Sequence, residues 1–286
     1  PRDMKLTSSG TITMIVLDKA YEITYDGKIL WSAPVLTDGR SDSIGHYHHE
    51  FTRLNNGNYM ALAQDFQYID PSQKDSAIAL LSKQKIKNRD NSLLFERFPT
   101  GTLIEYDSLG KIVWSWKASE HLNGSKIFLR NEKEYVSQMR AHENSFFFDT
   151  GNKVVYLSMR NLNTILMINY PTGNIIDIYN GDTPKLKETT PLLFCGQHSC
   201  KVSADRQLYF YNNNSCNPGR RPQIIFLRRN KQMATPEISW KFDCPVDTLS
   251  PAYPSGGNVE ELPDKSIFTS MAFPDSKMFI VTQIGR

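Results

Sequence analysis

A repeated pair of short strands constrains the fold of this chain more than any other sequence feature. The segment Tyr25–Ser32, with the sequence YDGKILWS, recurs at Tyr106–Trp116 as YDSLGKIVWSW. Weaker copies follow at Tyr170–Ile176 and between Arg229 and Trp240. In each copy a turn with Gly or Asn separates two runs of β-branched and aromatic residues, which is typical of a β-hairpin. The recurrence therefore predicts repeated antiparallel units.

Each hairpin follows a second pair of candidate strands, so the repeat has four strands. In the third unit they are expected at about 140–148, 153–160, 164–169 and 174–179. Four short antiparallel strands cannot bury their own faces and are typical of a β-propeller blade. Five units are predicted, beginning near Thr11, Ile44, Met139, Phe194 and Pro254. The first has no obvious inner strand and the last no obvious outer strand, so ring closure could combine them, or a further blade could be hidden.

The chain of 286 residues can form one large all-β domain or two smaller ones, and we predict a single β-propeller domain over residues 1–286. The units exceed the roughly 40 to 50 residues of compact propeller repeats. The excess falls in insertions at about 67–99, with a helix-like patch at 76–82, and at about 119–137. Long insertions on a rigid scaffold are where binding specificity usually lies.

The pattern of charged and apolar residues bears on two classes of partner. The 33 basic and 30 acidic residues nearly balance, and no basic block is interleaved with aromatic residues. The pairs Arg220–Arg221 and Arg228–Arg229 are expected at solvated strand ends, so we predict no nucleic-acid partner. No apolar run approaches the roughly 20 residues of a membrane-spanning helix.

Four cysteines lie in one short stretch of the chain, at Cys195, Cys200, Cys216 and Cys244. None forms a CxxC pair, which makes a zinc site a weak interpretation. Cys195 and Cys200 lie five residues apart on an expected strand, too far apart to form a disulfide. A disulfide would have to join different strands, with Cys195 and Cys216 the preferred pair. Four buried thiols are an equally good interpretation.

Three histidines occupy similar places in three of the units. His48, His142 and His198 each lie seven residues before a polar turn that leads into an apolar strand. Packing positions favour Leu, Val or Ile over imidazole, so the recurrence indicates a functional site. Because inner strands of a propeller run along its axis, equal register predicts that the three imidazoles converge in one axial pocket.

Strand alternation assigns sides to the neighbouring residues. With a period of two, Glu50 and Asn144 lie on the side of His48 and His142, whereas His49 points away into the blade interface. Structural hydrogen bonds between blades are the alternative explanation for histidines in such places.

The chemistry of the predicted pocket depends on Arg160, which lies one strand beyond Asn144. Three imidazoles also suggest a transition metal. A guanidinium beside a metal cation is electrostatically unfavourable, whereas Arg, Asn and several His together offer many donors and positive charge to an oxyanion. We therefore favour an oxyanion site without a metal or other cofactor.

These motifs resemble those of the bacterial arylsulfate sulfotransferases, exported β-propellers that move a sulfuryl group from an aryl sulfate to a phenol. The resemblance is carried by His48–Glu50 before the segment LNNGN, by Ala141–Ser145, by Ser158–Asn161 and by Gln197–Ser199, and spans about residues 45–257. It implies six blades, small-molecule aryl sulfate and phenol partners, and a periplasmic or secreted location with a signal peptide removed. We also expect a homodimer.

The resemblance implies a ping-pong reaction, independent of a nucleotide sulfate donor, through a covalent sulfohistidine. The nucleophile of that family falls on His198, and the residues that bind the sulfuryl oxygens fall on His142, Asn144 and Arg160. A neutral imidazole attacks sulfur while placed donors stabilise the charge on the equatorial oxygens.

An earlier family histidine falls on the pair His48 and His49, and the repeat register favours His48 as the catalytic one. His49 and Glu50 are then assigned to substrate binding. The general acid stays open between His48 and His142. Glu50 replaces the usual aspartate, and Asn212–Asn214 replaces the usual Asp-Asn-Gly style of turn.

Two other functions remain open from the residues. One is a non-catalytic propeller that binds a sulfated or other anionic ligand in the same pocket. The other is a metal-dependent lyase or hydrolase that uses the three histidines.

Overall fold

The structure is a computed structural model that describes residues 2–34, 46–68, 97–121, 141–181, 193–216, 221–229, 236–247, 256–272 and 276–282. The chain divides into two compact units, Pro1–Glu143 and Asn144–Arg286. The predicted helix-like patch at 76–82 and most of both insertions lie outside the described residues.

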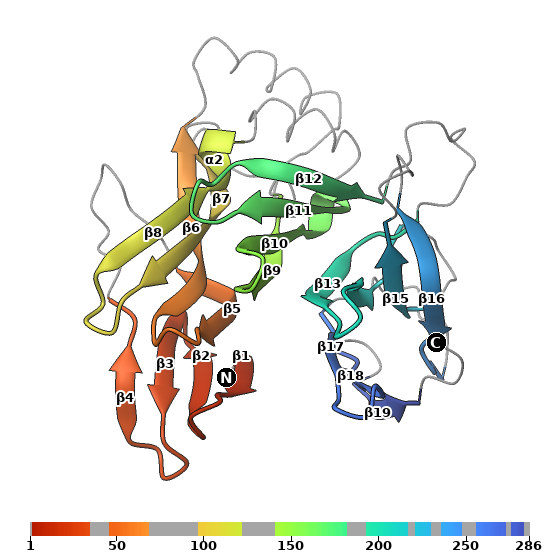
Figure 1. The fold of residues 1–286 in the computed structure, drawn as a ribbon, viewed down its shortest axis with the longest axis horizontal. Coiled ribbons are helices and arrows are strands. Elements are labelled where there is room, and N and C mark those ends of the chain that lie inside the picture. The colour runs from red at the N-terminus through yellow and green to blue at the C-terminus, as the bar shows by residue number, and fades with distance from the viewer. Residues whose placement is uncertain are drawn as a thin grey trace, which may run out of the picture. The chain divides into compact units, whose positions relative to one another are not determined.

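The first unit contains two four-stranded antiparallel sheets (Figure 1). One is formed in chain order by β1 (Arg2–Leu6), β2 (Ile12–Val16), β3 (Lys19–Ile23) and β4 (Ile29–Ser32). The other is formed by β5 (Tyr47–Arg53), β6 (Tyr59–Tyr68), β7 (Arg97–Tyr106) and β8 (Ile112–Lys117). A short helix, α2 (Ala118–His121), follows β8.

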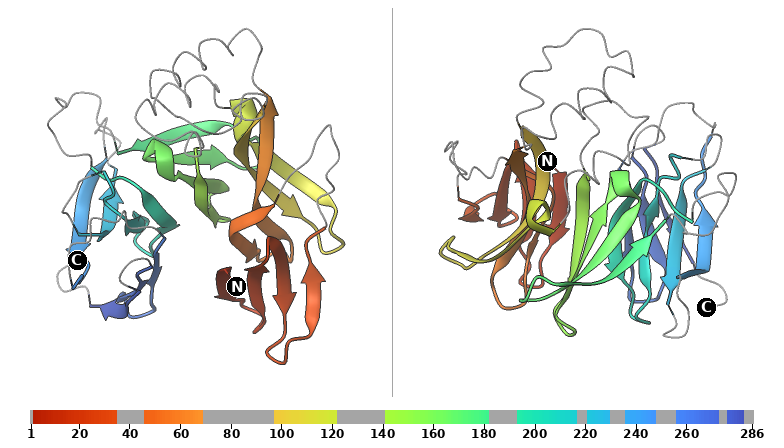
Figure 2. Two further views of the ribbon diagram at one scale, coloured as in Figure 1. Left: turned by 180° about the vertical axis from the view of Figure 1, so that it is seen from behind. Right: turned by 90° about the horizontal axis from the view of Figure 1, so that it is seen from above.

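The second unit contains three further antiparallel sheets, which Figure 2 shows from two other sides. The first is β9 (Glu143–Asp149), β10 (Val154–Met159), β11 (Thr164–Asn169) and β12 (Ile175–Asn180). The second is β13 (Gln197–Val202), β14 (Leu208–Asn212), β15 (Gln223–Arg228) and β16 (Glu237–Asp243). The third is β17 (Asn258–Glu261), β18 (Ile267–Ser270) and β19 (Met278–Val281).

The predicted fold class is confirmed: the chain is all-β and built of β-propeller blades, and five are found in the described residues. The first blade has the inner strand that the sequence seemed to lack, β1 at Arg2–Leu6. Its charged residues hid it from a search for apolar alternation. The last blade shows three strands in the part of the chain that the structure describes, as expected.

The repeated hairpins form where they were predicted, because glycine supplies the left-handed turn residue. Gly27 (φ 86°) lies between β3 and β4, and Gly110 (φ 81°) between β7 and β8. Trp31 of the first hairpin stacks on Tyr59 and Phe51, with ring centroids 3.9 and 5.8 Å away. It is the one buried residue of β4, so a single aromatic side chain fixes this edge strand to the core.

The central strands of the second unit are apolar on both faces. All six residues of β10 are buried, as are the five of β14. Continuous burial explains why these strands read as apolar runs rather than as alternating patterns. Among the helices of the described ranges, none is long and apolar enough to span a membrane.

Candidate functional site

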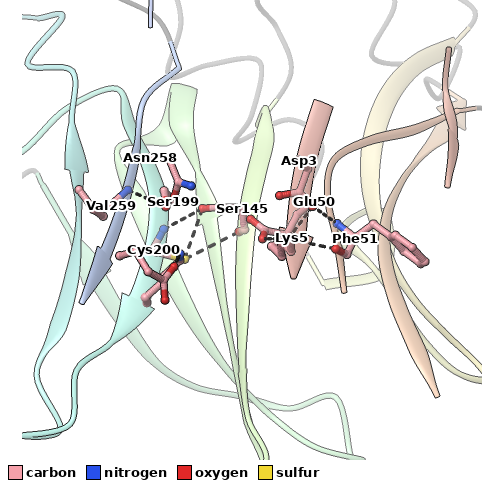
Figure 3. Close-up of polar contacts among 11 residues, drawn as sticks. Asp3, Lys5, Glu50, Phe51, Ser145, Ser199, Cys200, Asn258 and Val259 are labelled. Carbon is pink, nitrogen blue, oxygen red and sulfur yellow. Dashed lines mark hydrogen bonds and ion pairs between the residues drawn. The ribbon is translucent and has the colours of Figure 1, made fainter. Parts of the chain in front are cut away.

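A hydrogen bond from a backbone amide to a side-chain oxygen recurs between neighbouring inner strands within each unit (Figure 3). The donors and acceptors are Phe51 N to Asp3 Oδ2 at 2.6 Å, Cys200 N to Ser145 Oγ at 3.0 Å and Val259 N to Ser199 Oγ at 3.3 Å. These pairs give a common register, which we call the latch position. It is occupied by Asp3, Glu50, Ser145, Ser199 and Asn258.

The latch position shows that the three histidines do not share one register. His48 precedes Glu50 by two residues, His142 precedes Ser145 by three, and His198 precedes Ser199 by one. The prediction of equal register is therefore wrong. Distance from the turns does not give the register here, because β-bulges shift the pairing after Tyr47 and after His198.

In the first unit His48, His49 and His142 lie in one row. His48 Nδ1 is 2.9 Å from His49 Nδ1, and His49 Nε2 is 3.4 Å from His142 Nε2. The ring centroids are 5.0 and 5.1 Å apart. The expectation that His49 points away from the other two is wrong, because His49 has a left-handed backbone (φ 58°) that breaks strand alternation.

This row does not have the geometry of a three-histidine metal site. His49 directs one ring nitrogen to His48 and the other to His142, so the three rings cannot each aim one nitrogen at a common point. Within the residues that the structure describes, no group of three or more His, Cys, Asp or Glu is arranged to hold a metal ion.

Glu50 is buried and belongs to an ion cluster next to the row. Lys5 Nζ lies 2.5 Å from both Glu50 Oε1 and Asp3 Oδ2, and it donates to the Phe51 carbonyl oxygen at 3.0 Å (Figure 3). Burial alone would lower the pKa of Lys5, but the two carboxylates outweigh it and hold the pKa above its usual value. Glu50 thus joins two inner strands, and its role in substrate binding stays a prediction.

In the second unit, Gln197 holds the strand of His198 in place. Its Nε2 lies 3.0 Å from the carbonyl oxygens of Met159 and Thr164 and 3.2 Å from Ser158 Oγ. Asn144 Nδ2 donates to the Gln197 carbonyl oxygen at 2.7 Å. His198 is half-buried and follows directly, so three earlier segments of the chain fix the backbone before it.

Arg160 lies in the loop that Gln197 holds. The loop consists of the 3-10 helix η3 (Arg160–Leu162) and Asn163, and it runs between Met159 and Thr164. Arg160 Nη1 donates to Asn161 Oδ1 at 3.1 Å, and Gly196 N donates to Asn163 Oδ1 at 3.0 Å. The structure therefore brings the Arg160 loop against the segment that leads into His198.

Asn212, Asn213 and Asn214 fix the same segment from the other side. Asn212 Oδ1 accepts from Cys195 N at 2.9 Å, Asn213 Nδ2 donates to the Gly196 carbonyl oxygen at 2.7 Å, and Asn214 N donates to the Cys195 carbonyl oxygen at 3.0 Å. From the sequence alone these asparagines are expected only as a variant turn. Three consecutive amide side chains after a buried apolar strand were the signal that could have identified them.

The preferred disulfide is confirmed. Cys195 and Cys216 are bonded, with their Cα atoms 6.0 Å apart, whereas Cys200 and Cys244 are buried thiols outside it. The disulfide lies three residues before His198 and adds a covalent link to the asparagine contacts.

Together the second-unit residues can support nucleophilic chemistry on an anion. The His198 imidazole is half-buried and lies at a β-bulge, so part of it is accessible. The backbone after it is fixed, because Ser199 is left-handed (φ 55°) and its Oγ accepts a hydrogen bond from Val259 N. Arg160 offers a fork of donors that suits negatively charged oxygens, whereas Asn144 is fully buried and its Nδ2 donates to the Gln197 carbonyl oxygen. No metal is needed for such an attack.

The chain resembles known proteins in sequence family and in fold. The family model described as Arylsulfotransferase (ASST) matches residues 2–235. Among curated proteins, none matches the chain significantly. A solved protein of unknown function from Bacteroides caccae superposes with a TM-score of 0.51 at 9% identity, over 94% of this chain and 70% of that one. A luciferin-regenerating enzyme gives a TM-score of 0.49 at 12% identity, over 99% and 77%. The first likeness concerns the fold alone, and the second is too weak to support a conclusion.

Proposed function

The chain belongs to the arylsulfotransferase family, and from this premise we propose that it transfers a sulfuryl group from an aryl sulfate to a phenol through a sulfohistidine at His198. The family supports arylsulfotransferase activity in general. The covalent intermediate and the residue roles are the part that we propose.

The first half-reaction loads the histidine. The lone pair of a His198 ring nitrogen attacks sulfur, an S–N bond forms, and the S–O bond to the aryl group breaks. The phenolate keeps the bonding electrons and takes a proton from a general acid. In the second half-reaction a phenol oxygen attacks sulfur, loses its proton to a base, and the S–N bond returns its electrons to His198.

Charge stabilisation is assigned to fixed donors. Sulfuryl transfer resembles phosphoryl transfer in that the protein mainly aligns the reactants and stabilises charge on the equatorial oxygens. We assign Arg160, Asn144 and His142 to these oxygens, as the family resemblance implies. Arg160 offers a forked set of donors that suits an oxyanion.

The observation that carries the assignment of His198 is the position of Gln197. Because the Gln197 side chain donates to the carbonyl oxygens of Met159 and Thr164, the loop that contains Arg160 and the strand that contains His198 form one fixed element. Preorganisation of this kind is what electrostatic catalysis requires.

Intact-mass measurement tests the proposal. Wild-type protein incubated with 4-nitrophenyl sulfate and no acceptor should gain one sulfuryl group, and a phenol added later should remove it. His198→Ala should gain none. The matched control is His46→Ala, because His46 is an exposed histidine of the first unit and should leave loading unchanged. Wild-type protein that releases nitrophenol yet never carries the added mass would contradict the sulfohistidine.

We also propose a periplasmic or secreted location. Disulfides persist in oxidising compartments and are rare in the cytosol of most organisms, so the bond between Cys195 and Cys216 supports export. Association into a homodimer stays a prediction.

A further inference from the structure

We propose that His48, His49 and His142 form a proton relay, in which His49 passes protons between the other two imidazoles. The inference deepens the proposed function. Only the catalytic use of the relay rests on that function. The relay itself follows from the geometry of the first unit.

The central ring makes contact through both of its nitrogens. His49 Nδ1 lies 2.9 Å from His48 Nδ1, and His49 Nε2 lies 3.4 Å from His142 Nε2. A neutral imidazole is a donor at one nitrogen and an acceptor at the other. A ring with an imidazole at each nitrogen can therefore accept a proton on one side while it gives one up on the other.

The transfer conserves every proton and leaves no charge on His49. It starts with His48 protonated at both nitrogens and His49 carrying its proton on Nε2. The Nδ1 proton of His48 moves to His49 Nδ1, and the Nε2 proton of His49 moves to His142 Nε2. His48 ends neutral, His49 ends as its other tautomer, and His142 ends as the cation.

The backbone is arranged for this contact. His49 and His142 both have left-handed backbones, with φ of 58° and 56°. Non-glycine residues rarely adopt this backbone conformation. At His49 and His142 it turns the two rings toward each other, although the residues lie 93 positions apart in the sequence. Ordinary strand geometry would have aimed His49 elsewhere.

Two buried carboxylates lie next to the row in sequence. Glu50, next to His49, is 2.5 Å from Lys5 Nζ. Glu143, next to His142, is buried with its carboxyl group close to Gly101. The ring contacts at 2.9 and 3.4 Å join imidazole to imidazole, so each can pass a proton between nitrogens of the same chemical type.

The relay would serve the leaving phenolate. We assign His142 as the group that gives the proton to the phenolate oxygen, because the family resemblance assigns His142 to the sulfuryl group. His48 then restores the proton through His49. This assignment answers which of His48 and His142 is the general acid: both take part, at opposite ends of one chain.

Nuclear magnetic resonance on the full chain labelled with ¹⁵N-histidine tests the hydrogen-bonded row without any substrate. At a temperature where ring protons exchange slowly, we expect couplings across the hydrogen bonds between His48 Nδ1 and His49 Nδ1 and between His49 Nε2 and His142 Nε2. Both should vanish in His49→Asn and persist in His46→Asn. Folded wild-type protein with neither coupling would overturn the relay.

Kinetics test its use. General acid catalysis contributes about 10²-fold to 10⁴-fold, and more to poor leaving groups. His49→Asn should therefore slow phenyl sulfate about 10²-fold and 4-nitrophenyl sulfate much less, whereas His46→Asn should slow neither. An equal loss with both donors would reduce His49 to a structural role and overturn the relay. If wild-type protein turned over no aryl sulfate, the proposed function would fail, and the couplings alone would still decide whether the row exists.

Discussion

Gln197 and Met159 are joined by a 3.0 Å hydrogen bond from the Gln197 side chain to the Met159 carbonyl oxygen, across 38 residues of sequence. Because Arg160 follows Met159 and His198 follows Gln197, this bond sets the backbone of both candidate reacting residues. Their alignment therefore depends on a buried amide that takes no part in the chemistry itself.

Replacing this amide should reduce both activity and stability. Gln197→Leu removes the donor to the Met159 and Thr164 carbonyl oxygens, and the loss of a buried hydrogen-bond donor costs about 1–3 kcal/mol. We expect kcat to fall about 10-fold to 100-fold as the Arg160 loop shifts, measured with 4-nitrophenyl sulfate. Urea unfolding gives the stability change.

The matched control is Gln207→Leu, at a partly exposed glutamine that lies after the turn of the same hairpin. It should leave kcat unchanged. A Gln197 variant with normal kcat and lowered stability would show that the bond supports the fold alone.

The disulfide between Cys195 and Cys216 should stabilise the second unit. It closes a span of 21 residues, and a loop of that size corresponds to about 3 kcal/mol of unfolding free energy. The double variant Cys195→Ser/Cys216→Ser should lose about this much in urea unfolding. Reductant should destabilise the wild type and have no further effect on the double variant, and equal effects on both would contradict the assignment.

The thiol of Cys244 should resist alkylation until the chain unfolds. Burial raises its pKa from 9.0 to about 12, helped by the nearby charge of Asp243. Native protein at pH 8 should therefore take up no iodoacetamide at Cys244, whereas unfolded protein should react there. The same shift lowers stability as pH rises from 9 toward 12, because the thiolate forms first in the unfolded chain. Peptide mass mapping checks the first point and unfolding at several pH values the second.

Sequence reasoning succeeded where a local signal decided the structure. The glycine turns at Gly27 and Gly110 fixed two hairpins, and these repeats indicated the propeller blades. The same reasoning preferred the pair Cys195 and Cys216 among open alternatives, and the structure confirms this disulfide, with Cys195 before β13 and Cys216 after β14.

It failed where the structure depends on distant partners. His49 breaks strand alternation through a left-handed φ of 58°, which no neighbouring residue in the sequence predicts. β1 was missed because Asp3 and Lys5 find their partners in β5, 45 or more residues away. The role of Gln197 likewise depends on contacts 33 to 39 residues earlier in the chain.

The ion pair between Lys5 and Glu50 should prove structural. Glu50→Gln removes one of the two carboxylates that hold Lys5 and leaves Asp3 in place, so it should cost less than the roughly 3 kcal/mol of a fully uncompensated buried charge. The double variant Lys5→Met/Glu50→Gln should lose less than the sum of the single variants, and the difference in urea unfolding measures the coupling. KM for the aryl sulfate decides whether Glu50 also binds substrate: a rise in Glu50→Gln that Lys5→Met does not share would support that role.

Gly257 should tolerate a side chain poorly. Its φ is +95°, and a Cβ there would come within 2.4 Å of the Tyr211 ring. Tyr211 pairs with His198 across β13 and β14, so a displaced ring would disturb the strand of the nucleophile. Gly257→Ala should cost about 2–4 kcal/mol and lower kcat as well. Gly10→Ala is the matched control, since Gly10 has φ +76° with no atom within 4 Å of its Cβ, and it isolates the backbone cost of about 1 kcal/mol. Equal losses in urea unfolding for the two variants would show that the Tyr211 ring yields freely and that the packing behind His198 is looser than the contact implies.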